Sequence, residues 1–210
     1  MGKKKDIVWV SAAPMGGYIN KAFDADVFEE NQTAAIAIMK QNNAGVSLVA
    51  DQFPKKMYGM YPDKHYKKLP DLCTAGGFWT VSAATAEVLQ QFDLGDGGLY
   101  PVELFQHNRT KRIEGEYFCW NFGNVKKSYL PDDSNNMRYP FGSDMRCILS
   151  LARKDGDVAL SSEALNPPDV WVEQNIESAF FLSDPLVQAL RAAKVTRNFT
   201  LRKCRVIEQN

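Results

Sequence analysis

Apolar and polar positions follow a clear order in the C-terminal part of the chain. Residues 179–182 form a short apolar run of the kind that a buried strand supplies. Ser-Asp-Pro at 183–185 comes next, and all three residue types suit the first turn of a helix. Apolar residues then recur at helical spacing at Leu186, Val187, Leu190 and Ala193. The pattern predicts a strand, a capped helix and a closing strand over 199–205, whose inward face is ambiguous beyond Leu201.

A similar order of positions occurs around Ser82. Residues 78–81 are apolar, Ser82 stands at a predicted helix start, and a strand is predicted over 99–105. Leu89 has the same offset from Ser82 as Leu190 has from Ser183, and Leu94 matches Val195 in the same way. We interpret the two regions as two copies of a strand–cap–helix–strand unit, although any small α/β unit can produce such a pattern by chance.

The rest of the chain favours short strands. They are predicted at residues 7–10, 46–49, 99–106, 115–122, 146–152, 158–160 and 170–172. Residues 107–112 form a polar hairpin connection. Both faces of 115–122 are largely apolar, with Tyr117, Cys119 and Asn121 on one and Phe118, Trp120 and Phe122 on the other. This strand is therefore predicted to be central and covered on both sides.

Three segments are less regular. Residues 26–41 fit either a short helix or a strand, and residues 53–72 and 130–142 have loop composition. The predicted fold class is α+β, with a mixed, largely antiparallel sheet and a few short helices. No linker clearly divides the 210 residues. We therefore expect residues 1–72, a strand and loop region, to belong to the same domain as residues 73–210.

Charge and composition narrow the function only slightly. The chain is 45% hydrophobic and 24% charged, as globular proteins are. Its 25 basic and 25 acidic residues give no net charge, which disfavours a general nucleic-acid binder. Lysines do cluster among tyrosines in the loop at 53–72. They could form a surface for phosphates or acids, but a solvated loop is the favoured interpretation.

The cysteines and the N-terminus bear on the compartment. The four cysteines have no paired spacing, so the sequence predicts neither a disulfide framework nor a zinc ribbon, and free thiols fit a reducing compartment. Residues 1–5 are similar to the basic start of a signal peptide, but residues 7–13 are too short and interrupted for its apolar region. No apolar stretch is long enough to span a bilayer. We expect a cytoplasmic protein.

Candidate catalytic chemistry is sparse. The sequence has two histidines, His65 and His107, and lacks the GxSxG, Walker, HExxH and strand-following GxGxxG motifs. The aspartate pairs at 132–133 and 155/157 could bind a hard cation, but solvated surface is the favoured interpretation. We predict no catalytic, metal or cofactor-binding residues and no cofactor. A small enzyme that pairs His107 with Cys119 or a carboxylate stays open as an alternative.

Several segments together are similar to a known family. They are Phe92-Asp93-Leu94-Gly95 with Gly98-Leu99-Tyr100-Pro101-Val102, then Tyr117-Phe118-Cys119-Trp120-Asn121-Phe122, Pro168-Asp169-Val170-Trp171 and Phe180-Phe181-Leu182-Ser183-Asp184. In this order they resemble immunity protein family 11 of bacterial polymorphic toxin systems. The resemblance covers residues 74–207, and the first seventy residues carry little of it.

The resemblance implies a non-enzymatic antidote. Such proteins are encoded beside a secreted toxin, often one delivered by contact-dependent or type VI machinery, and they bind the toxin and block its active site or substrate path. The family supplies no catalytic residues, and its motifs fall here on predicted core strands and caps. The cognate toxin would be one that acts in the cytoplasm. Neither a nucleic acid nor a membrane is an expected partner.

Toxin contacts are expected from the two long loops, because loops vary while the core stays fixed. The candidate partner-binding residues are Tyr58, Tyr61, Lys64 and Tyr66 in the first loop and Asp132, Asp133, Arg138 and Tyr139 in the second. We expect an interface of standard size with aromatic anchors and a charged rim. An effector chaperone or adaptor is a further alternative, and the sequence leaves the oligomeric state open.

Overall fold

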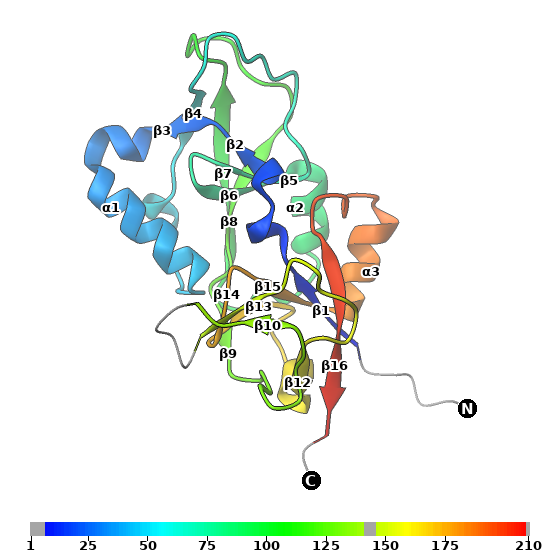
Figure 1. Cartoon of the computed structure of the whole chain (residues 1–210). Coiled ribbons are helices and arrows are strands. Elements are labelled where there is room, and N and C mark those ends of the chain that lie inside the picture. Colours follow the sequence, from blue (N-terminus) through cyan, green and yellow to red (C-terminus); the bar gives the residue numbers. More distant parts are fainter. Residues whose placement is uncertain (1–6, 141–145, 209–210) are drawn as a thin grey trace.

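The chain folds into sheets of mixed direction with helices packed against them (Figure 1). A computed structural model describes residues 7–140 and 146–208, and within these ranges the strands form sheets of seven, six and three strands. We call them the first, second and third sheets. This architecture confirms the predicted α+β class. The signal-like start at residues 1–5 lies outside the described residues.

The elements have the following bounds. The helices are α1 (Asp26–Asn43), α2 (Ala83–Leu89) and α3 (Asp184–Ala192). The strands are β1 (Val8–Ser11), β2 (Asn20–Lys21), β3 (Phe23–Ala25), β4 (Lys56–Gly59), β5 (Leu72–Ala75), β6 (Phe78–Ser82), β7 (Gly98–Phe105), β8 (Tyr117–Asn121), β9 (Val125–Lys126), β10 (Met137–Arg138), β11 (Cys147–Leu149), β12 (Ala159–Ser161), β13 (Val170–Glu173), β14 (Ile176–Glu177), β15 (Phe180–Ser183) and β16 (Leu201–Ile207). No helix within the described ranges is long and apolar enough to cross a membrane.

The first and second sheets share one pairing scheme. The first runs β2-β5-β6-β8-β7-β4-β3, and the second runs β12-β16-β1-β15-β13-β9. Read from β4 and from β12, the successive neighbours pair parallel, antiparallel, antiparallel, antiparallel and parallel in both sheets. The residue register also agrees. Val81 and Leu182, which directly precede the cap serines, pair with Leu72 and Val170 respectively.

The central strand of each sheet comes from a different place in the chain. In the first sheet β8 lies between β6 and β7 and follows both along the chain, whereas in the second sheet β1 takes that position although it precedes every other strand. We call the first sheet with α2 the first half and the second sheet with α3 the second half. The two halves have the same strand order, except that the strand equivalent to β8 is β1, at the start of the chain. The predicted pair of strand–cap–helix–strand units is confirmed, as β6-α2-β7 and β15-α3-β16.

The two caps form as the sequence predicts. The Ser82 hydroxyl accepts a hydrogen bond from the Thr85 amide, and the Ser183 hydroxyl accepts one from the Leu186 amide, each at 3.4 Å. The backbone amide of Ser82 in turn donates to the carbonyl of Asp71, and that of Ser183 to the carbonyl of Asp169. The two helices lie side by side (Figure 1) and bury their apolar faces in one shared core.

That shared core forms the seam between the halves. Trp79 and Phe180 occupy equivalent positions, three residues before each cap serine, and their rings meet at 5.6 Å in an edge-to-face contact. Trp120 and Phe122 of the first half complete the cluster around Phe180 at 5.2 and 5.0 Å between ring centres. The predicted two-sided burial of β8 is confirmed, because Trp120 faces this cluster while Cys119 packs in a second core on the opposite face.

Several local predictions are confirmed and others are wrong. The hairpin β7–β8 and the strands β1, β11, β12 and β13 form close to the predicted places, and α1 resolves the ambiguous segment at 26–41 as a helix with a break at Asn31. The predicted strand at 46–49 is absent. There the Leu48 amide donates to Oδ1 of Asn121 and its carbonyl accepts from the Tyr100 hydroxyl, so side chains satisfy the backbone that a strand ladder would otherwise pair.

The two predicted loops are also less irregular than expected. Residues 53–72 include β4, which pairs with β3 and β7 and buries Met57 completely, so this segment is in part a sheet strand. Residues 130–142 include β10, which pairs with β11 in the third sheet, and residues 141–142 lie outside the described ranges. The loop composition failed as a guide because these strands are short, with four residues in β4 and two in β10.

Candidate functional site

The eight predicted contact residues fall into two separate groups. Tyr58, Tyr61, Lys64 and Tyr66 belong to β4 and the loop after it, at the top of Figure 1, whereas Asp132, Asp133, Arg138 and Tyr139 belong to the segment around β10, in the lower half of the same view. The structure therefore brings residues together within each group and keeps the two groups apart.

Two of the tyrosines in the first group are held by this chain itself. The guanidinium carbon of Arg109 lies 4.5 Å from the ring centre of Tyr58, and Arg109 also forms an ion pair with Glu29 at 2.6 Å. The ring of Tyr66 packs on that of Phe23 at 5.3 Å. Both tyrosines are half-buried. They serve the fold of the first sheet more than a surface open to a partner.

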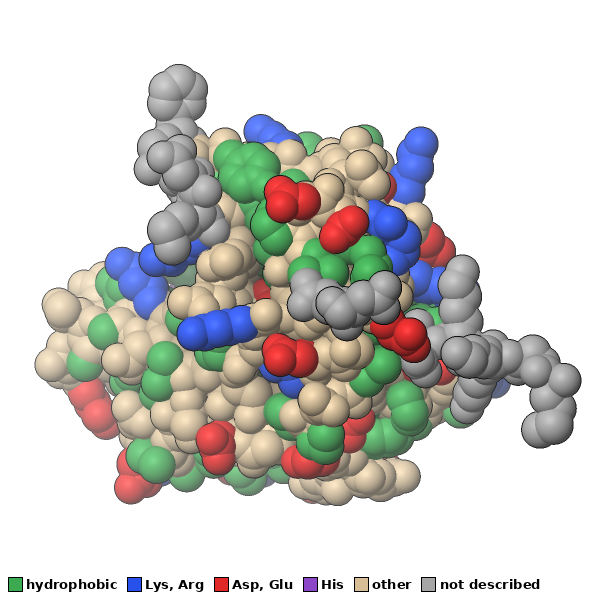
Figure 2. All heavy atoms as spheres, turned by 90° about the horizontal axis from the view of Figure 1, so that it is seen from below, with side chains coloured by type: hydrophobic (Ala, Val, Ile, Leu, Met, Phe, Trp, Pro, Cys, Tyr) green, Lys and Arg blue, Asp and Glu red, His purple; other side chains and the backbone are tan. Residues whose placement is uncertain are grey.

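The remaining pair of the first group is open to solvent. Tyr61 is exposed at 46%, and the ammonium of the exposed Lys64 lies 4.9 Å from its ring centre. In the second group all four side chains are exposed, and the backbone carbonyl of Asp133 accepts a hydrogen bond from Arg205. Seen from below in Figure 2, acidic, basic and hydrophobic side chains are interspersed. Charge alone therefore marks no docking surface on that face.

The thiols lie in apolar surroundings. All four cysteines are buried, and burial raises the pKa of Cys73 to about 12 and that of Cys119 well above its ordinary value. A nucleophilic cysteine needs the opposite, a lowered pKa. Nδ1 of His107 lies 3.1 Å from the carbonyl oxygen of Gly59, not beside a thiol. Within the described residues no three Asp, Glu, Cys or His side chains are placed to hold a metal ion.

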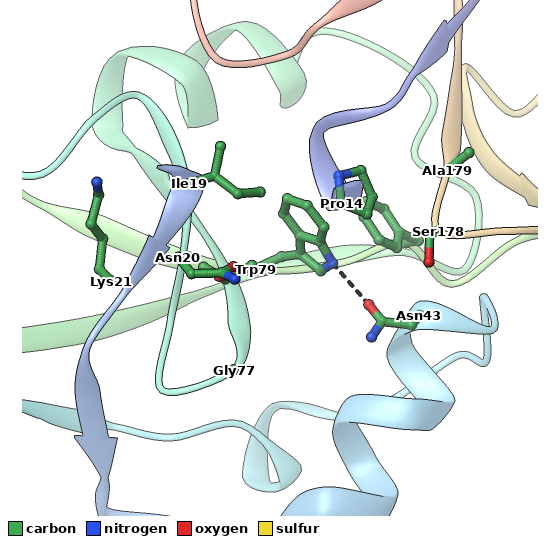
Figure 3. A pocket seen from close by; sticks show the side chains of 11 residues that line it. Pro14, Ile19, Asn20, Lys21, Asn43, Gly77, Trp79, Ser178 and Ala179 are labelled. Atoms are coloured by element: carbon green, nitrogen blue, oxygen red, sulfur yellow. Dashed lines mark hydrogen bonds between the residues drawn. The ribbon is translucent and has the colours of Figure 1, made fainter. Parts of the chain in front are cut away.

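A cavity of about 350 Å³ opens at the seam between the halves (Figure 3). Trp79 forms one wall, and its indole nitrogen donates to Oδ1 of Asn43, at the end of α1, at 2.9 Å. The other polar residues of the lining are Asn20 and Lys21 from β2, Thr74 from β5 and Ser178 from the turn before β15. The sequence did not predict this cavity, because its lining comes from segments that are distant in the chain and have no common pattern.

A second and larger groove, of about 720 Å³, shares Lys21 with that cavity. It lies between the segment before β5 and the segment after α3. Its basic side chains are Lys21, Lys68 and Arg197, and Asp71 is its acidic one. The lysine cluster in residues 53–72 was a partial signal for this groove, because it includes Lys68. Arg197 and Lys21 could not be assigned to the groove without the fold.

Comparisons with known proteins add nothing to this description of the site. No family model matches the chain, and no curated protein is similar to it at a significant level.

Proposed function

We propose that this protein is a non-enzymatic immunity protein that binds a cognate secreted toxin and neutralises it in the cytoplasm. One observation carries the proposal. The segments through which the sequence resembles the immunity family are separated by up to about ninety residues, and they pack together at the seam of the two halves. Residues that define a family by maintaining its framework are expected to meet in space in this way.

The contacts between these segments are direct. The Asp93 amide donates to Oδ2 of Asp169 at 2.9 Å, and the Asp169 amide donates to the carbonyl of Asp93 at 2.8 Å. This exchange joins the segment after α2 to the segment before β13. The Trp120 ring of the motif in β8 packs edge-to-face on Phe180 of the motif in β15 at 5.2 Å. The motifs thus support one another across long stretches of chain.

The motifs belong to the buried framework of the fold. Trp120, Trp171 and Phe180 are fully buried, so they build a rigid framework and do not offer reactive groups to a substrate. A framework of this kind can hold surface segments in fixed positions, and fixed positions lower the entropic cost of binding a protein partner. Neutralisation would follow from covering the active site or the substrate path of the toxin.

Co-expression tests the proposal. The C-terminal toxin domain encoded by the neighbouring gene would be expressed in the cytoplasm with and without this protein, and survivors would be counted. Immunity predicts rescue together with co-purification of a stable complex. A complex without rescue would favour the chaperone or adaptor alternative. Neither rescue nor a complex would contradict both, and the Cys/His enzyme would then be tested by substitution of His107.

A Phe180→Ala variant serves as a control for the folded framework. Because this side chain is buried at the seam, its loss should destabilise the fold and reduce rescue, and urea unfolding followed by circular dichroism would detect the lower stability. Variants on the surface that lose rescue while they stay folded then identify the contact region.

A further inference from the structure

Equivalent lysines occupy the two halves of the molecule. Lys21 of β2 pairs with Ala75 of β5, and Lys126 of β9 pairs with Glu173 of β13. Ala75 and Glu173 each lie three residues beyond the equivalent positions Leu72 and Val170. The same backbone site therefore presents a lysine in both sheets, and the surroundings of the two lysines can be compared directly.

The site around Lys126 is closed. Its ammonium donates to the carbonyls of Ala164 at 3.3 Å, of Pro168 at 3.1 Å and of Asn166, and it lies 3.7 Å from the ring centre of Trp171. The Asp93–Asp169 exchange closes the same region, and Asn124 donates to the carbonyls of Leu94, Phe122 and Val170. The chain itself thus fills this place in the second half.

The corresponding site around Lys21 is open. Its ammonium donates to the carbonyl of Tyr18 at 2.9 Å and faces the groove of about 720 Å³. Lys68 and Arg197 are exposed on the walls of that groove, and within the described residues neither forms an ion pair with an acid. Asp71 accepts a hydrogen bond from the Ser82 hydroxyl at 2.8 Å, so its carboxylate is directed toward the helix cap.

We propose that this groove is the docking surface for an acidic segment of the protein partner, an inference that rests on the proposed immunity function. Three cations share the groove with one engaged carboxylate, in a chain whose total charge is zero, so the local excess is complementary to carboxylates. The exposed Tyr18, held by a 2.7 Å hydrogen bond between its hydroxyl and that of Thr200, supplies an aromatic anchor at the edge. The groove of about 720 Å³ is much larger than a single small anion, so a segment of an acidic chain fills it better.

Charge reversal tests this assignment. The Lys68→Glu/Arg197→Glu variant would be titrated with an inactivated form of the neighbouring gene's toxin domain by isothermal titration calorimetry. The matched control is Lys64→Glu/Arg138→Glu, which reverses one exposed lysine and one exposed arginine of the predicted loops. Groove docking predicts a loss of affinity of roughly tenfold or more for the first variant and little change for the second. The wild-type affinity should also fall more steeply with salt than that of the groove variant.

The outcomes separate the two proposals. Equal affinity of wild type and groove variant, with rescue retained in both, overturns the groove and leaves the immunity function standing. Loss of affinity in the loop variant alone also overturns the groove and returns the interface to the loops. No complex with wild type overturns both. Binding of inorganic phosphate at the groove, with full partner affinity in the charge-reversed variant, would replace the docking surface by a small-anion site. Circular dichroism of both variants verifies that each is folded.

Discussion

The two halves of this molecule share one order of strand pairing but differ in the space beside β5 and β13. In the second half, a buried carboxylate, a caged lysine and a network of asparagine and aspartate hydrogen bonds fill the region beside β13. In the first half, the corresponding region beside β5 is an open groove with uncompensated basic side chains. Two halves with the same strand scheme can therefore differ in the space beside these strands, which the chain fills in one half and leaves open in the other.

The clearest single difference lies at the equivalent positions Ala75 and Glu173. Glu173 is 3% exposed, and its carboxylate accepts hydrogen bonds from the backbone amides of Ser128 and Tyr129 and from the indole of Trp171. A buried carboxylate is stable only when donors replace its lost hydration. Ala75 needs no such shell, so the first half requires no equivalent of the segment at 128–129.

The largest expected effect comes from breaking the seam that both halves share. Phe180→Ala should lower the free energy of unfolding by about 4 kcal/mol, since Phe180 is fully buried and its loss leaves a cavity among Trp79, Trp120 and Phe122. Urea unfolding followed by tryptophan fluorescence and by circular dichroism measures this. The two probes should give one coincident transition. Separate transitions would show that the halves are independent units and contradict the shared core.

A smaller loss is expected at the filled site. Glu173→Ala should cost about 3 kcal/mol, because the amides of Ser128 and Tyr129 and the indole of Trp171 lose their acceptor in a buried place. Chemical denaturation measures the change, with Glu173→Gln as the conservative variant that keeps one acceptor oxygen. The partner affinity of the Glu173→Gln protein should stay at the wild-type value. A change there would mean that the filled half also binds.

Removal of the two cap serines should cost different amounts of stability, because the Ser82 hydroxyl makes a further hydrogen bond to Asp71. Ser183→Ala should cost about 1 kcal/mol, the ordinary value for a lost N-cap. Ser82→Ala should cost about 2 kcal/mol, since the Ser82 hydroxyl also donates to Asp71 at 2.8 Å and that half-buried carboxylate would lose its donor. Thermal and urea unfolding of the two variants under identical conditions gives the comparison. Equal costs would show that the Asp71 bond adds nothing to stability.

The smallest effect is a pH dependence of stability that comes from Lys126, whose ammonium is surrounded by carbonyl groups. Burial lowers the pKa of Lys126 to about 8, with the charges of Glu173 and Asp169 acting in the opposite direction. Below pH 8 the folded and unfolded states both hold the proton. Between about 8 and 10.5 the unfolded chain holds more protons, so this residue makes stability rise with pH. Across that window the free energy of unfolding of wild type, measured with urea, should rise relative to that of Lys126→Met. A constant difference between the two proteins would contradict the lowered pKa.

Local elements could be read from the sequence where chemistry close by decides them. The cap serines, the helical spacing behind them and the two-sided apolar pattern of β8 all predicted what the structure has. The segment at 46–49 could not be read in this way. Its valines favour a strand, but the side chains of Asn121 and Tyr100, more than fifty residues away, take its backbone hydrogen bonds.

The site was harder to predict than the fold. Tyr58 and Tyr66 have the composition of an interface, yet Arg109 and Phe23 hold them within the chain. The groove, in contrast, joins Lys68 to Arg197 only because the segment before β5 and the segment after α3 meet at the seam. A basic groove whose members lie over a hundred residues apart leaves no pattern in the sequence.

The sequence by itself determined the α+β class, the two capped units and the identity of the central strand of the first sheet, because each depends on side chains that are neighbours along the chain. Only the tertiary structure decided that β1 completes the second sheet, since β1 carries no signal of its distant partners β15 and β16. It also decided that Lys126 is surrounded by carbonyl groups, whereas Lys21 faces an open groove. Those outcomes depend on packing between remote segments, and packing is a property of the folded chain as a whole.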